Sequence, residues 1–271
     1  SMNIDPKTLD NISWGSHENY MVDLNVDFFK LEKALVPFLI SRQIYGGSGW
    51  LDVNFFGKIS FLLAQRPLVT HSRVGGTTTG NRPIVGNKNE PLADGSLFRR
   101  LHLVMGDSNM SPWASWLKIK ATSMVLDLIE DDYFPDSFGF FNVHNPVHVL
   151  KEISRDLSFS YRFSVGNKMH TALTIQRFYL DLVQRYYLLE ERREPDEETK
   201  KAIELWQITL DLIEAREFQL LAFLFDNFAK LQLFESVLSR TGISLKEDHN
   251  RPLFINSDMS SAMFNYLKQI D

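Results

Sequence analysis

Apolar residues in the first 112 positions come in short runs, separated by clusters of glycine, threonine and asparagine. Residues 20–24 have the pattern of a short strand, and residues 28–43 repeat apolar side chains at the spacing of one helical face. The runs 56–63 and 101–105 also predict strands, whereas the polar stretch 75–81 predicts a flexible loop. We therefore expect this part to form a sheet accompanied by a helix.

After residue 112 the apolar pattern has the period of helices. Ser111-Pro112 predicts a helix start, because serine caps free backbone N–H groups and proline suits the first turn. Three further long helices are predicted at 170–191, 197–215 and 217–239. In the last of these, packing in a core is enough to explain the spacing of the apolar side chains, which are Phe223, Phe225, Phe228, Leu231 and Leu233.

The order of the predicted elements gives the fold class. Strands and loops come first and a helical lobe follows, which is an α+β pattern without the regular alternation of a doubly wound sheet. We expect residues 1–112 to form the sheet and residues 113–271 to form a helical lobe packed on it.

Composition excludes several classes of function. The chain has no cysteine, so disulfides, thiolate metal sites and cysteine nucleophiles are absent. A net charge of -5 gives no general excess of basic residues for binding nucleic acid. No apolar run is long enough to cross a membrane, and no signal peptide is recognisable, so we expect a cytoplasmic protein that binds neither nucleic acid nor membrane.

Three polar groups in the first part carry candidate chemistry. His17, Glu18 and Asn19 could offer a metal ligand and hydrogen bonds from one strand edge, although a histidine that enters a strand is more often structural. Arg82 and Lys88 stand in a glycine-containing segment, 82–94, that would suit phosphate oxygens. The alternative for this segment is an ordinary solvated loop.

The third group surrounds the predicted strand at 101–105. Arg99, Arg100 and His102 lie at one end of this strand, and the run Gly106-Asp107-Ser108-Asn109 lies at the other. These residues are rich in groups that bind anions and form hydrogen bonds. An ordinary turn can have the same Gly-Asp-Ser-Asn sequence.

Taken together and in order, these segments resemble the family of Pup ligases and Pup deamidases. The matching segments are 16–20, Arg42-Gln43, Gln65-Arg66, 82–84, 89–91, Ala93-Asp94, 99–102 and 106–111. The helical part resembles the family at Ile175-Gln176-Arg177 and Leu205-Trp206. The run from Arg82 to Ser111 is the most specific part of the resemblance, which extends over nearly the whole chain.

The resemblance implies a fold and an activity. The family is similar to glutamine synthetase, in which a curved antiparallel sheet forms a cradle for ATP and magnesium. Its ligases activate the C-terminal glutamate of the small protein Pup as a γ-glutamyl phosphate, which a lysine of a substrate protein attacks to give an isopeptide bond. Its deamidases convert a C-terminal glutamine of Pup to glutamate and also remove Pup from substrates.

The same resemblance implies roles for individual residues. It implies nucleotide binding by His17, Asn19, Arg82, Lys88, Arg100 and His102. It implies that His17 is also a metal ligand. Supporting roles are implied for Glu18, Arg66, Glu90, Asp107 and Asn109. No catalytic residue is assigned. A phosphate site needs several donors aimed at one point, so we expect Arg82, Arg100, His102 and His17 to converge on one concave surface.

The sequence also departs from the family pattern. The family begins with a strand that carries a glutamate pair for magnesium, and a later strand carries an aspartate base or nucleophile, and neither is found before Ser16. The small C-terminal domain of the family is not found either. Lys88, Leu92 and Pro112 replace a usual arginine, histidine and acidic residue. We therefore expect this chain alone to lack ligase and hydrolase activity.

Three functions remain open at this stage. A Pup-ligase-like enzyme is favoured by Ser108, where deamidases usually have alanine. A deamidase or depupylase of the same fold is the first alternative, and a non-catalytic subunit that binds the modifier is the second. Apart from the modifier and its substrate proteins, the expected partner is either a separate N-terminal chain that completes the sheet or a second copy of this chain, since open sheet edges invite pairing.

Overall fold

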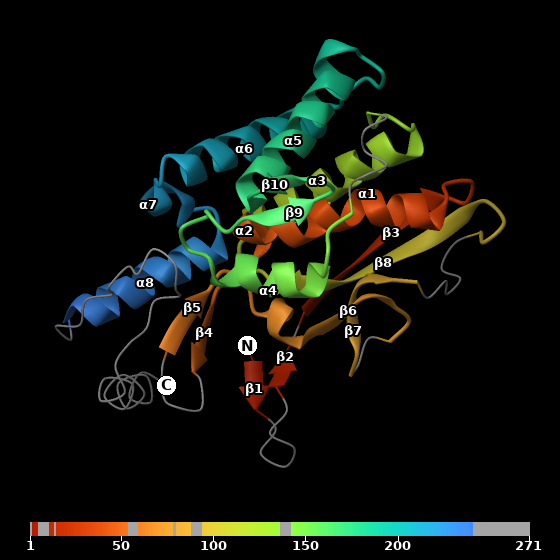
Figure 1. The fold of residues 1–271 in the computed structure, drawn as a ribbon. Coiled ribbons are helices and arrows are strands. Elements are labelled where there is room, and N and C mark those ends of the chain that lie inside the picture. Colours follow the sequence, from red (N-terminus) through yellow and green to blue (C-terminus); the bar gives the residue numbers. More distant parts are fainter. Residues whose placement is uncertain are drawn as a thin grey trace.

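A computed structural model describes residues 2–4, 11–13, 15–53, 59–77, 80–87, 94–135 and 142–240 of the chain (Figure 1). Helices and a mixed sheet make up these ranges, so the predicted α+β class is confirmed. In the same ranges, none of the helices combines the length and the apolar character that crossing a bilayer requires.

The central sheet of the described part has the strand order β3-β8-β7-β6. Its strands are β3 (Gly15–Asp23), β8 (Phe98–Asp107), β7 (Arg82–Gly86) and β6 (Thr70–Gly75). β8 runs antiparallel to both β3 and β7, whereas β6 and β7 are parallel, so the sheet is mixed rather than wholly antiparallel. Among the described strands β3 pairs with β8 alone, and the expected addition of strands from another polypeptide or copy stays a prediction.

Pairing across β3 and β8 sorts their side chains onto two faces. Tyr20 lies opposite Leu101, and Glu18 lies opposite Leu103. These positions and Val22 are buried or half-buried and form the inner face of the sheet, which the helices cover. The other positions, including Asn19 opposite His102, form the outer face.

Helix α1 (Phe28–Ser41) lies at the centre of the molecule, and Figure 1 shows it between the sheet and the helices α5 and α6. Every residue from Ala34 to Ser41 is buried, as expected of a helix that is apolar on all sides. Asp27 caps its start by accepting the backbone N–H of Lys30. The predicted helix at 28–43 is thus confirmed, with α2 (Gln43–Gly46) following directly.

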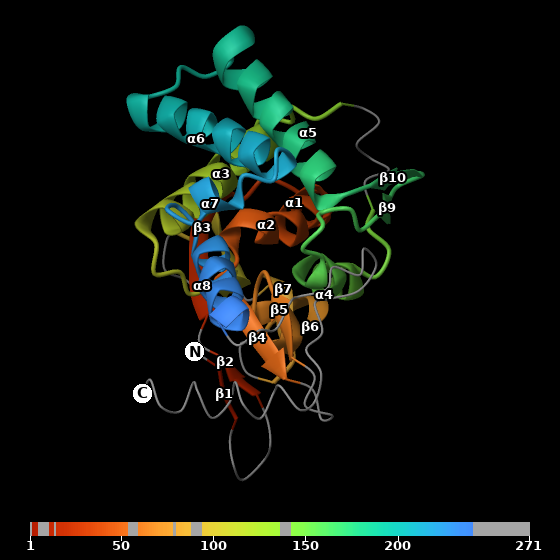
Figure 2. The same cartoon turned by 90° about the vertical axis from the view of Figure 1, so that its left-hand side faces the viewer.

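The remaining helices surround α1. They are α3 (Pro112–Glu130), α4 (Pro146–Arg155), α5 (Ala172–Gln184) continued by a π-helical turn (Arg185–Leu189), α6 (Glu197–Glu214), α7 (Phe218–Leu221) and α8 (Asp226–Arg240). Figure 2 shows α5 and α6 on one side of α1, with α4 and the strands β6 and β7 on another. Ser111 caps α3 as predicted, and α6 closely matches the prediction at 197–215.

Smaller elements complete the described part. They are β1 (Met2–Ile4), β2 (Asn11–Ser13), β4 (Trp50–Val53), β5 (Ile59–Leu62), the 3-10 helix η1 (Arg66–Val69), β9 (Phe163–Val165) and β10 (Lys168–His170). β5 matches the end of the strand predicted at 56–63, whose first residues lie outside the described ranges.

The prediction of one helix over 217–239 is wrong. The chain forms α7 and then starts α8 anew at Asp226. The break has a local reason, because Ser111 donates its hydroxyl to the carbonyl of Leu224 and the Asp226 carboxylate accepts the backbone N–H groups of Met110 and Ser111. The core explanation also fails for Phe223 and Leu233, which are exposed, although Phe225, Phe228 and Leu231 are buried.

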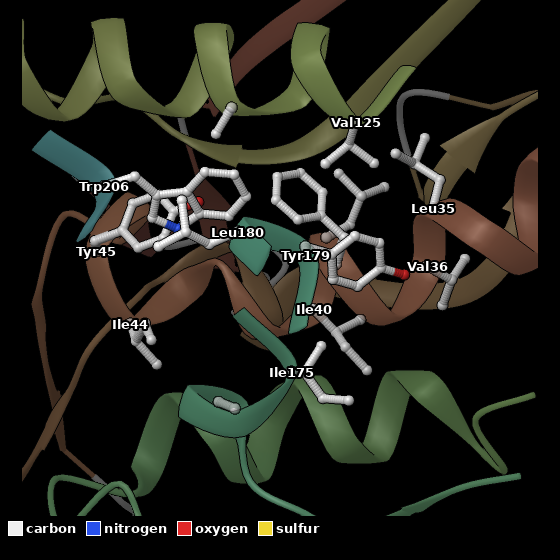
Figure 3. Close-up of a cluster of buried hydrophobic side chains, with 14 of the residues drawn as sticks. Leu35, Val36, Ile40, Ile44, Tyr45, Val125, Ile175, Tyr179, Leu180 and Trp206 are labelled. Atoms are coloured by element: carbon white, nitrogen blue, oxygen red, sulfur yellow. The ribbon is translucent and has the colours of Figure 1, made fainter. Parts of the chain in front are cut away.

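The hydrophobic core forms where α1 meets α3, α5 and α6 (Figure 3). Trp206 of α6 has no exposed surface and packs edge-on against Phe38 of α1, with ring centroids 5.8 Å apart. Tyr179 of α5 packs against the same Phe38 at 5.3 Å. This core takes residues from before and after position 112, and the expected division into two parts there stays a prediction.

Candidate functional site

Two histidines and an Arg–Asn pair lie on the outer face of the sheet. His17 of β3 and His102 of β8 approach each other with Nδ1 and Nε2 3.2 Å apart, so one ring nitrogen can donate to the other. The Nε of Arg100 donates to Oδ1 of Asn19 at 2.8 Å. Register explains this meeting, because β8 places Arg100 and His102 two residues apart and β3 places His17 and Asn19 likewise.

Arg82 and Arg66 extend this group of side chains. Gly86 of β7 pairs with His102, so alternation along β7 brings Arg82 to the same outer face. Burial, followed by the positive charges of Arg66, Arg82 and Arg100, lowers the pKa of His17 below its ordinary value. Since all three charges act on one imidazole, we name His17, Arg66, Arg82, Arg100 and His102 the cationic cluster.

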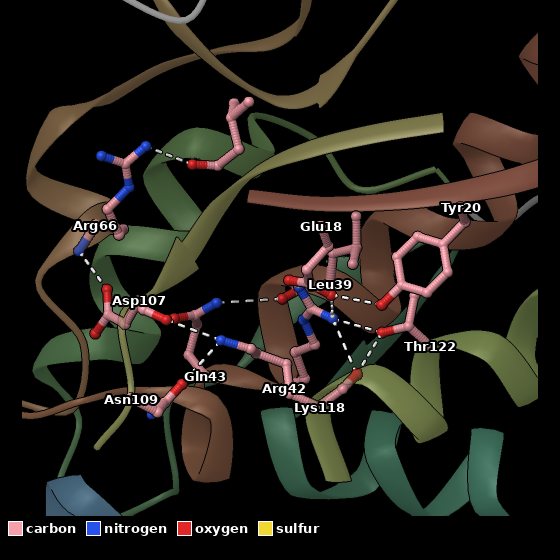
Figure 4. A network of polar contacts seen from close by, with 11 residues as sticks. Glu18, Tyr20, Leu39, Arg42, Gln43, Arg66, Asp107, Asn109, Lys118 and Thr122 are labelled. Carbon is pink, nitrogen blue, oxygen red and sulfur yellow. Dashed lines mark hydrogen bonds and ion pairs between the residues drawn. The ribbon is translucent and has the colours of Figure 1, made fainter. Parts of the chain in front are cut away.

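A buried carboxylate fixes the position of Arg66. Asp107, at the end of β8, has no exposed surface and accepts the backbone N–H of Arg66 at 2.8 Å and that of Gln65 at 3.0 Å. The Asp107 carboxylate also accepts the backbone N–H and the hydroxyl of Ser48. The guanidinium of Arg66 donates to the carbonyl of Val104. Figure 4 shows Arg66 and Asp107 at one end of the polar network.

Gly15 leaves the space that the Arg66 side chain occupies. A Cβ atom at Gly15 would lie 2.6 Å from Nε of Arg66, which no side chain can tolerate without displacing the guanidinium. The start of β3 and the start of η1 are therefore fitted to each other around Arg66.

A buried ion pair lies on the opposite, inner face of the sheet. Both guanidinium nitrogens Nη1 and Nη2 of Arg42 donate to the carboxylate of Glu18, at 2.9 and 2.5 Å, and both side chains are buried. Tyr20 donates its hydroxyl to the same carboxylate at 2.7 Å. Burial alone would raise the pKa of Glu18, but Arg42, Lys118 and the Tyr20 hydroxyl together hold it below its ordinary value.

Lys118 connects the inner network to the turn that follows β8. Its ammonium donates to the backbone carbonyl of Asp107 and to Oδ1 of Asn109, each at 2.8 Å. Asn109 in turn donates to the carboxylate of Asp226 at 3.1 Å. Burial lowers the pKa of Lys118, while Glu18 acts in the opposite direction. This chain of contacts links α3 and α8 to the residue that holds Arg66.

The structure brings together most of the residues named from the sequence. His17, Asn19, Arg82, Arg100 and His102 all lie on the outer face, and Arg66 joins them. Asp107 and Asn109 lie behind them, where they hold backbone and side-chain partners. Lys88 and Glu90 lie outside the described residues. The nucleotide-binding role of each residue stays a prediction.

Glu18 faces the interior, away from the cationic cluster, although its neighbours His17 and Asn19 lie on the outer face with the cluster. Its carboxylate is used by Arg42, a residue that the sequence marked by resemblance only. Lys118 and Asp226 were missed. The sequence could have indicated that Lys118 is buried, because it stands four residues after Ala114 and three before Ala121 and so shares their face of the helix.

No magnesium site is formed by the described residues. Within the ranges that the structure describes, no three histidine, aspartate or glutamate side chains gather closely enough to hold a metal ion. Magnesium prefers octahedral oxygen ligands, whereas the neighbours of His17 are a histidine and positive charges. The role of His17 as a metal ligand therefore stays a prediction without a ligand set.

The cationic cluster is suited to bind a multiply charged anion. The half-buried guanidinium groups of Arg82 and Arg100 are planar forks that match phosphate and carboxylate oxygens. Arg66 is buried and donates to the carbonyl of Val104, so it adds positive charge from behind them, and the two histidines add ring nitrogens. The chain belongs to the Pup-ligase protein family, whose sequence model matches residues 3–259.

Relatives in this family carry both of its activities. The chain is 36% identical over 244 residues to the Pup deamidase/depupylase of Mycolicibacterium smegmatis, covering 89% of this chain and 47% of the relative. It is 31% identical over 249 residues to the Pup–protein ligase of Renibacterium salmoninarum, covering 92% of this chain and 52% of the relative. The chain thus spans about half the length of the curated relatives it matches.

Solved structures agree with the sequence comparison. The ligase PafA in its complex with the prokaryotic ubiquitin-like protein Pup matches with a TM-score of 0.75 and 31% identity, over 90% of this chain and 49% of that chain. PafA in complex with ADP matches with the same TM-score and identity, over 91% of this chain and 53% of that chain. At this identity the likeness covers both fold and sequence.

Proposed function

We propose that this chain forms part of an ATP-dependent ligase that joins the C-terminal glutamate of a Pup-like modifier to a lysine of a substrate protein. The cationic cluster carries this proposal, because it gathers three arginines and two histidines on one face of the sheet. Support also comes from the Pup–protein ligases among its relatives and from the matching structure of PafA with ADP.

The chemistry assigns the cluster a binding role. Arg82 and Arg100 would bind phosphate oxygens of the nucleotide, and the buried Arg66 would add its positive charge behind them, so that all three offset the negative charge that builds up during phosphoryl transfer. Burial and the charges of Arg66, Arg82 and Arg100 lower the pKa of His17, which favours the neutral imidazole, and this ring would orient a partner through hydrogen bonds. Asn19 fixes the orientation of Arg100.

Replacing Arg100 by glutamine is expected to weaken ADP binding about ten- to a hundredfold. One charge-assisted hydrogen bond to a phosphate contributes about 1.5–3 kcal/mol, and 1.4 kcal/mol is a factor of ten in affinity. Isothermal titration calorimetry of the wild-type chain and of Arg100→Gln with ADP measures the change.

Arg99→Gln is the matched control. Arg99 is the adjacent residue of β8, but it donates to the carbonyl of Val26 at 2.9 Å and its guanidinium stacks over Phe28. We expect its ADP affinity to stay within about twofold of wild type. Equal losses in both variants, or no binding of ADP by the wild-type chain, would contradict the proposed phosphate site.

A deamidase or depupylase is the second candidate. The deamidase/depupylase of M. smegmatis is 36% identical to this chain, against 31–33% for the Pup–protein ligases compared with it, which favours neither activity strongly. Both activities would use the same cationic cluster, so the cluster does not separate them.

The C-terminal residue of the modifier, glutamate or glutamine, distinguishes the two activities. Because this chain alone is expected to be inactive, the assay uses it together with the partner that supplies the missing strands. With ATP, magnesium and a Pup-like protein ending in glutamate, we expect a ligase to release ADP, because the glutamate is phosphorylated. A deamidase acts on the form ending in glutamine and releases ammonia. Intact-mass spectrometry of both forms after incubation distinguishes them, and conversion of the glutamine form alone would overturn the ligase assignment.

A further inference from the structure

We infer that Lys118 is a positioning residue for the cationic cluster, acting through Asp107 on Arg66. Lys118 lies on α3, inside the molecule, and its ammonium donates to Asp107 and Asn109, which lie behind the cluster. Its side chain is 2% exposed, which is rare for lysine unless its charge is used. This inference rests on the proposed function of the cluster as a phosphate site.

The first link joins Lys118 to the turn after β8. Its ammonium donates to the carbonyl of Asp107 and to the side chain of Asn109, both at 2.8 Å. A buried ammonium needs such acceptors, because an unpaired charge away from water is costly. The lysine therefore holds residues 107 and 109 in one fixed arrangement relative to α3.

The second link joins that turn to Arg66. The Asp107 carboxylate accepts the consecutive backbone N–H groups of Gln65, which precedes η1, and Arg66, which begins it. The carboxylate and the carbonyl of Asp107 belong to one residue, so a shift of its backbone moves both contacts together. Loss of the ammonium frees the carbonyl of Asp107 and lets the start of η1 move.

The third link is the close fit around the guanidinium of Arg66. Gly15 lies so close that a Cβ there would come within 2.6 Å of Nε. A small movement of η1 therefore changes where the guanidinium lies relative to Arg82 and His17. Positioning of this kind matters because groups that bind phosphate act best when held in place before the ligand arrives.

The test replaces Lys118 by methionine, which keeps most of the side-chain length and removes the charge. We expect the Kd of the chain for ADP, measured by calorimetry, to rise about tenfold. Lys120→Met is the matched control on the same helix. The ammonium of Lys120 lies 3.9–4.0 Å from Glu198 and Asp196 in partly exposed pairs, which contribute little, so its Kd should not change.

A double variant separates positioning from a general loss of stability. In an Arg66→Ala background, Lys118→Met should change the Kd for ADP by less than about twofold, because the residue through which it acts is gone. A purely structural role for Lys118 would lower the affinity equally in both backgrounds, and that result would overturn the inference.

Hydrogen exchange gives a readout that needs no ligand. In Lys118→Met the backbone amides of Gln65 and Arg66 should exchange about tenfold faster, while amides in the middle of α6 keep their protection. If the wild-type chain does not bind ADP, the proposed function fails, and the exchange of these two amides still decides the positioning role. Unchanged exchange at 65 and 66 overturns it. Should Lys118→Met not fold, Asn109→Ala removes one acceptor of the ammonium and is expected to change the same two amides in the same direction.

Discussion

Replacing Arg42 by methionine is expected to lower the free energy of unfolding by about 3–5 kcal/mol. The change leaves the Glu18 carboxylate buried between the sheet and the helices without its bidentate partner. Removing one member of a buried pair costs far more than removing both, because the remaining charge stays away from water. Urea unfolding followed by circular dichroism measures the loss.

The double variant Glu18→Leu/Arg42→Met is the control for this prediction. It removes both charges, so we expect it to be clearly more stable than Arg42→Met alone. A double variant no more stable than Arg42→Met would show that packing, and not the stranded charge, causes the loss.

The ion pair also predicts a pH dependence. The pKa of Glu18 is lowered in the folded state, so its contribution to stability is fully present above the ordinary glutamate value of 4.5 and is lost as the pH falls below it. We therefore expect the free energy of unfolding of wild type to fall relative to that of the double variant as the pH drops below about 5. Denaturation curves at several pH values measure this difference.

Trp206→Ala is expected to lower the free energy of unfolding by about 3–5 kcal/mol. Trp206 is fully buried where α6 packs against α1, and its indole contacts Phe38 edge-on. Truncation removes the largest buried side chain in the described part and leaves a cavity that rigid helices fill only partly. Thermal or urea unfolding gives the value.

Trp113→Ala is the matched control for the tryptophan, because Trp113 lies near the start of α3 with 49% of its surface exposed. We expect it to cost less than about 1 kcal/mol. A loss at Trp113 as large as that at Trp206 would contradict the assignment of the core to the interface of α1 and α6.

The sequence predicted the elements whose pattern is local. The helix at 28–43, the cap at Ser111 and the helix at 197–215 follow from spacing and capping, and the structure has all three. The break between α7 and α8 was not predictable in this way. It depends on Asp226 and Leu224 finding partners more than a hundred residues away, at Met110 and Ser111.

The candidate site was predicted only in part, because strand alternation is a local pattern whereas helix packing is not. Alternation along β3 and β8 places His17, Asn19, Arg100 and His102 on one face once the two strands are paired. The resemblance supplied the expectation that the histidines and arginines converge, but not the pairing of the strands, which the structure shows. The opposite orientation of Glu18 follows from the same alternation. The roles of Lys118 and Asp226 depend on how α3 and α8 pack on the turn after β8, which no local pattern encodes.

The alternation of His17, Glu18 and Asn19 also limits how this segment can change over evolution. One strand supplies the outer face with two polar side chains and the interior with a carboxylate, and the three residues are consecutive. Inserting or deleting a single residue in β3 after the register irregularity between Ser16 and Glu18 would exchange the faces on one side of the change, burying an amide or exposing the partner of Arg42. We therefore expect insertions and deletions to be much rarer in β3 than in the connection between β6 and β7 when related sequences are compared.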